Sequence, residues 1–229
     1  MTVAGMALTA RLGVWQLDRA AQKRELQAQV ETRSQAAPLG NAELASVTDA
    51  MMQRRVDLRG HWLHDRTIYL DNRPLNGRVG FFVLTPLQLD GSKQAVLVQR
   101  GWVPRDAADR THVPTVPTPG GDVQVLGRLV PSPSRVYELG KGASSAIRQN
   151  LDSQAYGRET GLSLLPAAVL EAGASGDGLL RDWPAPDLGL QTHYGYAFQW
   201  FALCALILGL YVWFQLLKRP ARTDGPQSS

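Results

Sequence analysis

His193 opens a long apolar segment near the end of this 229-residue sequence. No Asp, Glu, Lys or Arg occurs between residues 188 and 217, so an ionisable ring at this position is a candidate functional group. If the segment is helical, one of its faces carries His193, Ala197, Trp200 and Cys204, which follow one another at spacings of four, three and four. Tyr196 lies beside this face. A haem site needs such features: an axial nitrogen, an apolar slot and little bulk near the ring plane.

The alternative for His193 is an interfacial anchor. Tyr194 and Tyr196 follow it closely, and all three rings would then hold their polar tips among lipid headgroups. Composition alone favours this second interpretation. The single cysteine, Cys204, leaves no Cys pair for copper or zinc and no internal disulfide.

The element that must position His193 is a membrane helix. Residues 194–217 are long enough to cross the hydrocarbon layer, which is about 30 Å thick. Aromatic residues lie at both ends of the segment, as they do at the two interfaces of a bilayer. Lys218, Arg219 and Arg222 follow it directly. Because positive charge is retained inside, the tail of residues 218–229 is predicted to be cytoplasmic and His193 to lie outside.

Residues 1–17 form a second apolar segment, which is short for a membrane span and contains Arg11. A signal peptide fits poorly, because a basic leader and small cleavage-site residues are missing. We expect a first membrane helix that is shortened at its beginning, for example by a misassigned start codon, with both termini cytoplasmic. Two features weigh against this: Arg19, Lys23 and Arg24 would lie outside, and no basic inner flank precedes the helix.

Between the two spans we expect a helical connector over residues 18–53 and a periplasmic, β-rich domain over residues 54–190. Short β-branched and aromatic runs with turn residues between them predict the strands. Asn76-Gly77 and Asp90-Gly91 predict tight turns, so the sheet should be dominated by antiparallel pairs. Asp152 should cap a short helix. The expected fold class is therefore a membrane protein with an extramembrane α+β domain.

Enzyme motifs are absent from the sequence: there is no G-x-S-x-G elbow, H-E-x-x-H pair or P-loop. His61 and His64 would point to opposite faces of one strand, which favours surface residues over a metal pair. Arg73 and Arg100 could face haem propionates or an acidic protein surface. The structural alternative, in which they bond carbonyls or nearby Asp residues, weighs more. The net charge of +4 is spread along the chain, which argues against nucleic acid as a partner.

Motifs from about residue 11 to residue 213, weak singly but specific in their order, resemble the surfeit locus protein one family of cytochrome c oxidase assembly factors. They are LGVWQLDRAAQK, LDNRPLNGRVGFFVLTPL, VLVQRGWVP, QNLD, LLP, RDWP and HYGYAFQWFAL. The resemblance implies a two-span inner-membrane protein with a large outer loop, and the absence of an Arg/Ser-rich transit peptide favours a bacterial source. It also implies a role in building the haem a centres of haem-copper oxidases.

For particular residues, the resemblance matches His193 to the histidine that opens the family's second span, which favours a haem ligand over a bare anchor. Tyr196 and Trp200 match the aromatic positions that follow it. Trp15, Gln16 and Arg19 match the outer end of the first span, which would lie beside His193. The implied cofactor is haem a, bound transiently. The implied partners are oxidase subunit I, the lipid bilayer and, as a further candidate, haem a synthase.

Three functional hypotheses follow. The first is a non-enzymatic haem a chaperone that holds the cofactor through His193 between the two helices and passes it to subunit I. The second is a scaffold that stabilises subunit I without touching haem, since the chain shows no obvious second axial ligand. The third and weakest is a membrane-anchored periplasmic hydrolase, for which a nucleophile and base are lacking.

Overall fold

The computed structural model describes residues 2–106, 108–109, 112–132, 146–173, 176–183 and 189–217. It divides the chain into two units, which are described separately. One unit combines the ends of the chain, Met1–Gln29 and Pro184–Ser229. The other is the central part, Val30–Trp183, which carries the sheet.

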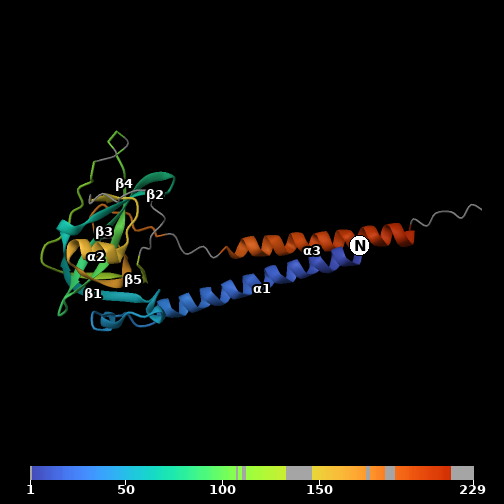
Figure 1. The fold of residues 1–229 in the computed structure, drawn as a ribbon, viewed down its shortest axis with the longest axis horizontal. Helices are drawn as coiled ribbons and strands as arrows, with labels where there is room; N and C mark the ends of the chain where they lie inside the picture. Colours follow the sequence, from blue (N-terminus) through green and yellow to red (C-terminus); the bar gives the residue numbers. More distant parts are fainter. Residues whose placement is uncertain are drawn as a thin grey trace, which may run out of the picture. The chain divides into compact units, whose positions relative to one another are not determined.

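The first unit is a pair of helices (Figure 1). α1 runs over Thr2–Gln35 and α3 over Leu190–Val212, with a π-helical turn at Trp213–Leu217. The two helices touch along a seam of small residues: a Cβ built on Gly13 would lie 2.7 Å from the ring of Phe201. The Cys204 thiol also reaches the backbone oxygen of Met6, at 3.5 Å.

Among the described helices, α3 and its extension are long and apolar enough to cross a membrane, over Gln191–Gln215. This agrees with the span expected over residues 194–217. α1 does not meet that criterion, because Arg11 and then Asp18, Arg19 and further charges interrupt its apolar stretch. The shortened first span therefore stays a prediction.

The expected connector differs from the structure beyond Gln35. α1 continues without a break from the apolar residues into the polar ones, and ends at Gln35. Pro38 lacks an N–H and disfavours helical backbone at the residue before it, so the helix cannot continue through it. Leu39 instead exchanges backbone hydrogen bonds with the first strand, at Arg55 and Asp57. Two 3₁₀ turns, Glu43–Ser46 and Asp49–Met51, complete the segment.

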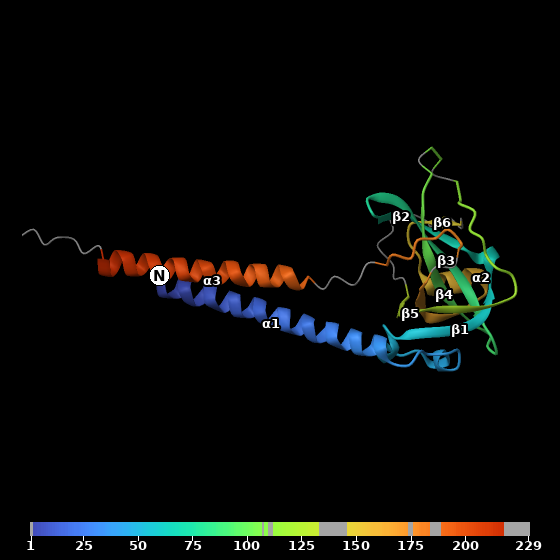
Figure 2. The ribbon, with the colours of Figure 1, turned by 180° about the vertical axis from the view of Figure 1, so that it is seen from behind.

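The second unit is built on one seven-stranded sheet (Figure 2). Its strands are β1 Arg55–Trp62, β2 Ile68–Leu75, β3 Arg78–Leu89, β4 Gln94–Pro104, β5 Asp122–Pro131, β6 Ile147–Arg148 and β7 Ser163–Glu171. The order is β1-β5-β7-β4-β3-β2-β6, and β1 also pairs with β3. The β1–β3 pairing closes five strands into a barrel-like ring. Gly60 permits this closure, because any Cβ there would overlap the backbone oxygen of Gln88.

The hairpins predicted from local turns are present, but the sheet is not wholly antiparallel. Asn76 and Gly77 both have positive φ, at 50° and 75°, and join β2 to β3. β4–β7 and β2–β6 are parallel pairs, which the local turn residues do not reveal. The short helix before β7, α2 Ser153–Thr160, begins as predicted: the Asp152 carboxylate accepts two backbone N–H bonds, and Gly161 ends the helix in the left-handed region.

The interior of the ring is packed with aliphatic side chains. Its largest buried cluster includes Val56, Leu58, Leu87, Val96, Val98, Leu129 and Val169. These residues come from β1, β3, β4, β5 and β7, so the core depends on closure of the ring. Its burial, at about 25 cal/mol per Å² of apolar area, supplies the main force that holds the strands together.

Candidate functional site

His193 lies in the first turn of α3 and faces α1. Its Nδ1 is 2.7 Å from Oε1 of Gln16, a residue 177 positions earlier in the chain and only 9% exposed. An amide oxygen can only accept, so Nδ1 donates and the proton resides there. Nε2 is then the atom with the free lone pair, and it has no hydrogen bond within the described residues. The helical pair therefore presents an oriented imidazole at the end where α3 begins.

The predicted face of α3 is the one that meets α1. Ala197 is buried at 2% exposure, and His193, Trp200 and Cys204 are partly buried. Tyr196 is 49% exposed and lies off this face. The seam thus contains the imidazole, the small residue and the indole in sequence along one side of the helix.

On α1, the residues that the family resemblance placed beside His193 do not all face α3. Gln16 belongs to the buried stripe with Thr9, Gly13 and Ala20, and this stripe faces α3. Trp15 is 48% exposed, and the Arg19 guanidinium lies 5.7 Å from its ring centre. Gln16 is therefore the residue of its segment that contacts His193, while Trp15 and Arg19 lie on the outward side of α1.

Basic side chains surround the same end of the helical pair. The Arg24 guanidinium lies 5.7 Å from the ring centre of Tyr194, the residue after His193. A Cβ on Gly189, at the beginning of α3, would lie 3.6 Å from the Lys23 ammonium. Together with Arg19, these side chains place three cations on the turns of α1 at this end, which also carry the carboxylates of Asp18 and Glu25.

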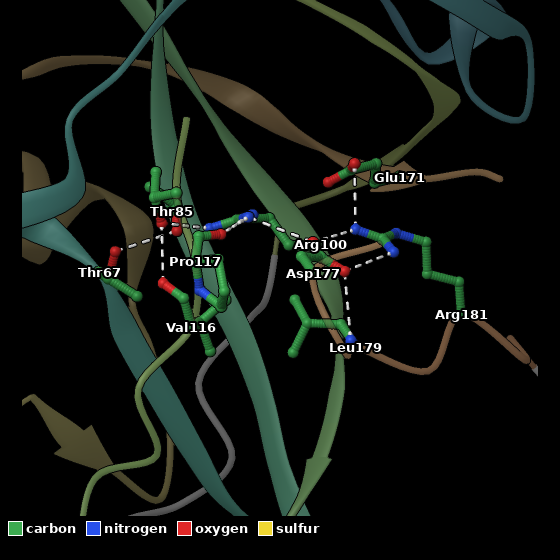
Figure 3. A network of polar contacts seen from close by, with 10 residues as sticks. Thr67, Thr85, Arg100, Val116, Pro117, Glu171, Asp177, Leu179 and Arg181 are labelled. Carbon is green, nitrogen blue, oxygen red and sulfur yellow. Dashed lines mark hydrogen bonds and ion pairs between the residues drawn. The ribbon is translucent and has the colours of Figure 1, made fainter. Parts of the chain in front are cut away.

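A second polar site lies in the sheet unit, around Arg100 (Figure 3). Val83 pairs with Gly101 and Leu84 with Gln99, so Arg100 is the extra residue of a β-bulge in β4. The bulge directs its side chain inward, where it is 2% exposed. The guanidinium donates to the Pro117 oxygen at 2.9 Å, to Thr118 Oγ1 at 2.7 Å and to the Asp177 carboxylate at 3.2 Å.

Asp177 links Arg100 to a second buried arginine. Arg181 donates to Asp177 at 2.6 and 3.0 Å and to Glu171 at 3.1 Å (Figure 3). Burial raises the pKa of the Glu171 carboxyl, and Arg181 and Arg100 offset that rise only in part. We call Arg100, Glu171, Asp177 and Arg181 the buried charge cluster.

These contacts confirm the structural interpretation of Arg100 and Arg73, in which the two side chains bond carbonyl groups or nearby Asp residues. Arg100 donates to Pro117 and Thr118 of the proline-rich loop, residues 112–121, and to the carboxylate of Asp177. Arg73 donates to the Gln149 carbonyl at 2.9 Å, and its own carbonyl accepts from Trp102 Nε1 at 2.7 Å. Sequence reasoning missed the partners Glu171 and Asp177, because Asp177 and Arg181 lie in an irregular segment whose spacing carries no helical or strand signal.

His61 and His64 lie at the surface of the sheet unit, as predicted, although His64 follows the end of β1 and does not share the strand with His61. His61 is in β1 and His64 in the short turn His64–Arg66; both are exposed, and His64 Nε2 pairs with Asp65 at 3.0 Å. His112 is also exposed, in the proline-rich loop.

The fold defines a class of protein with two parts. The middle of the chain forms a barrel-like β unit, and the two ends of the chain form a pair of helices, one of which is apolar and long enough to span a membrane. Residues 3–205 match the SURF1 family, and the chain belongs to that family. It is 27% identical over 221 residues to a SURF1-like protein of Rickettsia bellii, covering 93% of this chain and 88% of that protein. It is 27% identical to surfeit locus protein 1 of Rattus norvegicus, over 93% of this chain and 73% of the rat protein.

A shorter match concerns a relative whose name states a role. The cytochrome oxidase assembly protein SHY1 of Saccharomyces cerevisiae is 34% identical over 94 residues. That match covers 40% of this chain and 24% of the yeast protein.

Proposed function

We propose that the protein is an assembly factor for cytochrome c oxidase that binds haem a through His193 and assists its insertion into subunit I. Membership of the SURF1 family and the name of the yeast relative support the assembly role. The observation that carries the haem-binding role is the 2.7 Å contact of His193 Nδ1 with Gln16, which leaves Nε2 available.

Gln16 acts on His193 as outer-shell partners act on metal-binding histidines. By accepting from Nδ1–H it fixes the tautomer and the ring orientation, and it raises the basicity of Nε2. The bound group would supply an iron atom that accepts this lone pair. Without Gln16 the ring would be free to rotate or to expose the wrong nitrogen.

The remaining residues of the helical pair fit a haem. Ala197, one turn below His193, is small, and Trp200 offers a flat apolar surface. Arg19, Lys23 and Arg24 are placed at the end where propionate carboxylates would need cations, and guanidinium groups bind carboxylates well. His193 is the only histidine in the helical unit. A single protein imidazole suits a site that must release its cofactor.

The same proposal includes a location and partners. α3 crosses the bacterial inner membrane, α1 crosses it beside α3, both termini are cytoplasmic, and the sheet unit is periplasmic. Subunit I is the acceptor, and haem a synthase is a candidate donor. The basic residues after Leu217 support this orientation.

The test is a visible spectrum of the protein purified from a host that makes haem a. Wild type should carry haem a, His193→Ala should lose the spectrum of the ligated haem, and Gln16→Ala should retain it with about 10–100-fold weaker binding. His64→Ala is the matched control, because that histidine is exposed in the sheet unit. An unchanged spectrum in His193→Ala would remove His193 as the ligand.

The alternative is a scaffold that stabilises subunit I and binds no haem. The presence of only one histidine in the helical unit favours it, since many haem sites use two protein ligands. It expects the wild type to co-purify with subunit I without stoichiometric haem. It also expects His193→Ala to leave that co-purification intact.

A further inference from the structure

Three exposed side chains with metal-binding groups converge at one end of β1. They are His61, Asp90 and Asp122, and their ligand atoms all lie within 4.8 Å of one another. The strand register explains the convergence. His61 pairs directly with Asp122 on β5, and on the other side it pairs with Gln88 on β3. Paired residues share a face, and Asp90 lies two residues beyond Gln88 on that face, so all three side chains point the same way.

The backbone of each of these residues is held in place. His61 and Asp122 are members of paired strands. Asp90 donates its N–H to the Arg59 oxygen at 3.1 Å, and its own oxygen accepts from Asn41 Nδ2 at 3.3 Å. Closure of the ring at Gly60 brings β3 against β1 at this level. The backbone positions of the three groups are therefore fixed, those of His61 and Asp122 by strand pairing and that of Asp90 by its backbone hydrogen bonds.

The side chains of the three residues are available to bind a ligand. Within the described residues, His61, Asp90 and Asp122 form no side-chain hydrogen bond and no ion pair within 4 Å. Arg59, on the same face of β1, forms no ion pair with either carboxylate. Two carboxylates are thus held near each other and near an imidazole without an ion-pair partner among the described residues, an arrangement that a cation would stabilise.

We propose that His61, Asp90 and Asp122 form a binding site for a divalent transition-metal cation, with Zn²⁺ as the reference ion. One imidazole and two carboxylates are ligands that this ion accepts, at about 2.0–2.2 Å each. Tetrahedral geometry then requires ligand atoms about 3.4 Å apart, which small rotations of these exposed side chains reach. Three protein ligands leave a fourth position open.

Two of the three proposed ligands border a surface hollow. His61 and Asp122 also line a cavity of about 950 Å³, together with Tyr69, Thr118 and the proline-rich loop. A fourth ligand from solvent or from a partner protein can reach the metal through this hollow. The site is in the sheet unit, and it is independent of the haem-binding proposal for His193.

Zinc titration of the full chain in detergent, purified without a polyhistidine tag, tests the site. Calorimetry at pH 7.5 should show one equivalent of Zn²⁺ bound by the wild type. His61→Ala, Asp90→Asn and Asp122→Asn should each weaken binding by more than about tenfold, since outer-shell changes alone cost about 10–100-fold. Co²⁺ in place of Zn²⁺ gives a second readout, because its visible bands report the coordination geometry and should be lost in the same variants.

His112→Ala is the matched histidine control and should bind like the wild type. Unchanged far-UV circular dichroism shows that a variant is folded, and all three changes are at exposed positions. Absence of binding to the wild type up to about 1 mM free Zn²⁺ would overturn the proposal. So would binding that survives in all three variants. If His64→Ala weakened Zn²⁺ binding as much as His61→Ala does, the proposal would also be overturned, because the metal would then be bound by residues that line the surface hollow.

Discussion

Replacing Asp177 with alanine tests whether the buried charge cluster holds the sheet unit together. Asp177 is the shared acceptor of Arg100 and Arg181, and all three side chains are 6% exposed or less. Its carboxylate also accepts from the Leu179 N–H at 3.2 Å. Removal would take the shared carboxylate away from both arginines, while the Arg181 contact with Glu171 would remain.

The size of the effect follows from burial. Removing one partner of a buried ion pair costs about 3–5 kcal/mol, because the remaining charge stays desolvated. That is a large part of the roughly 5–15 kcal/mol by which domains are stable. With an m value of about 2 kcal/mol per molar urea, the unfolding midpoint should fall by about 1.5–2.5 M. Asp177→Asn keeps the shape and separates the loss of charge from the loss of packing.

Urea unfolding of the full chain in detergent, followed by tryptophan fluorescence, measures this shift. The indole of Trp62 is a local reporter, since the Arg100 guanidinium lies 5.0 Å from its ring centre. Glu159→Gln is the matched control: it breaks a pair with Arg148 whose acid is 40% exposed, and it should cost no more than about 1 kcal/mol. Equal midpoints for Asp177→Ala and Glu159→Gln would refute the reasoning.

Two further predictions concern pH and the helical seam. Burial gives Glu171 a folded-state pKa above its unfolded value, so the folded state holds its proton longer, and stability should fall as pH rises from about 4.5 through the raised pKa. Glu171→Gln should flatten that decline in urea midpoints taken across pH, and an unchanged slope would contradict it. Gly13→Leu should separate α1 from α3 because it overlaps Phe201, whereas Gly209→Leu has open space around it. Crosslinking between cysteines placed on the two helices should fall only in the Gly13 variant.

Local features of the fold were predictable from the sequence where one short segment carries the whole signal. Asn76-Gly77 specifies a hairpin because both residues tolerate positive φ, and the Asp152 cap needs only the three residues that follow it. The parallel β4–β7 pair and the closure of β1 on β3 were not predictable in this way. They depend on which distant strands fit together, and Gly60 signals only that some backbone approaches closely.

In the candidate site, too, the sequence predicted the features that lie on one segment and missed those that join distant segments. Helical periodicity alone predicted the face of His193, Ala197 and Trp200, since all of it lies on one segment. Gln16 as the hydrogen-bond partner required a match across 177 positions: the resemblance placed Trp15, Gln16 and Arg19 beside His193, but it did not say which of them contacts the ring. The proposed metal site was not predictable for a related reason: His61 lies on β1, Asp122 on β5 and Asp90 in the turn after β3, and no spacing in the sequence connects them.

The motif VLVQRGWVP shows why resemblance in the sheet unit argues for a fold more than for a cofactor site. Arg100 fills the bulge and bonds the proline-rich loop. Gly101 has room for Leu179 only because it lacks a Cβ, which would lie 2.6 Å from the Leu179 Cβ. Trp102 pairs its backbone with Leu180 and donates Nε1 to Arg73.

Three consecutive residues thus perform three structural tasks, and each fixes a segment distant in sequence. Family likeness at these positions is explained by the need to close and pin the barrel-like ring. His193 differs, because it is only partly buried and lies in the first turn of α3. What the Gln16 contact adds there is an oriented, unblocked nitrogen, for which packing gives no reason. The helical pair is therefore where a loss of function without a loss of stability is expected, and His193→Ala should separate the two.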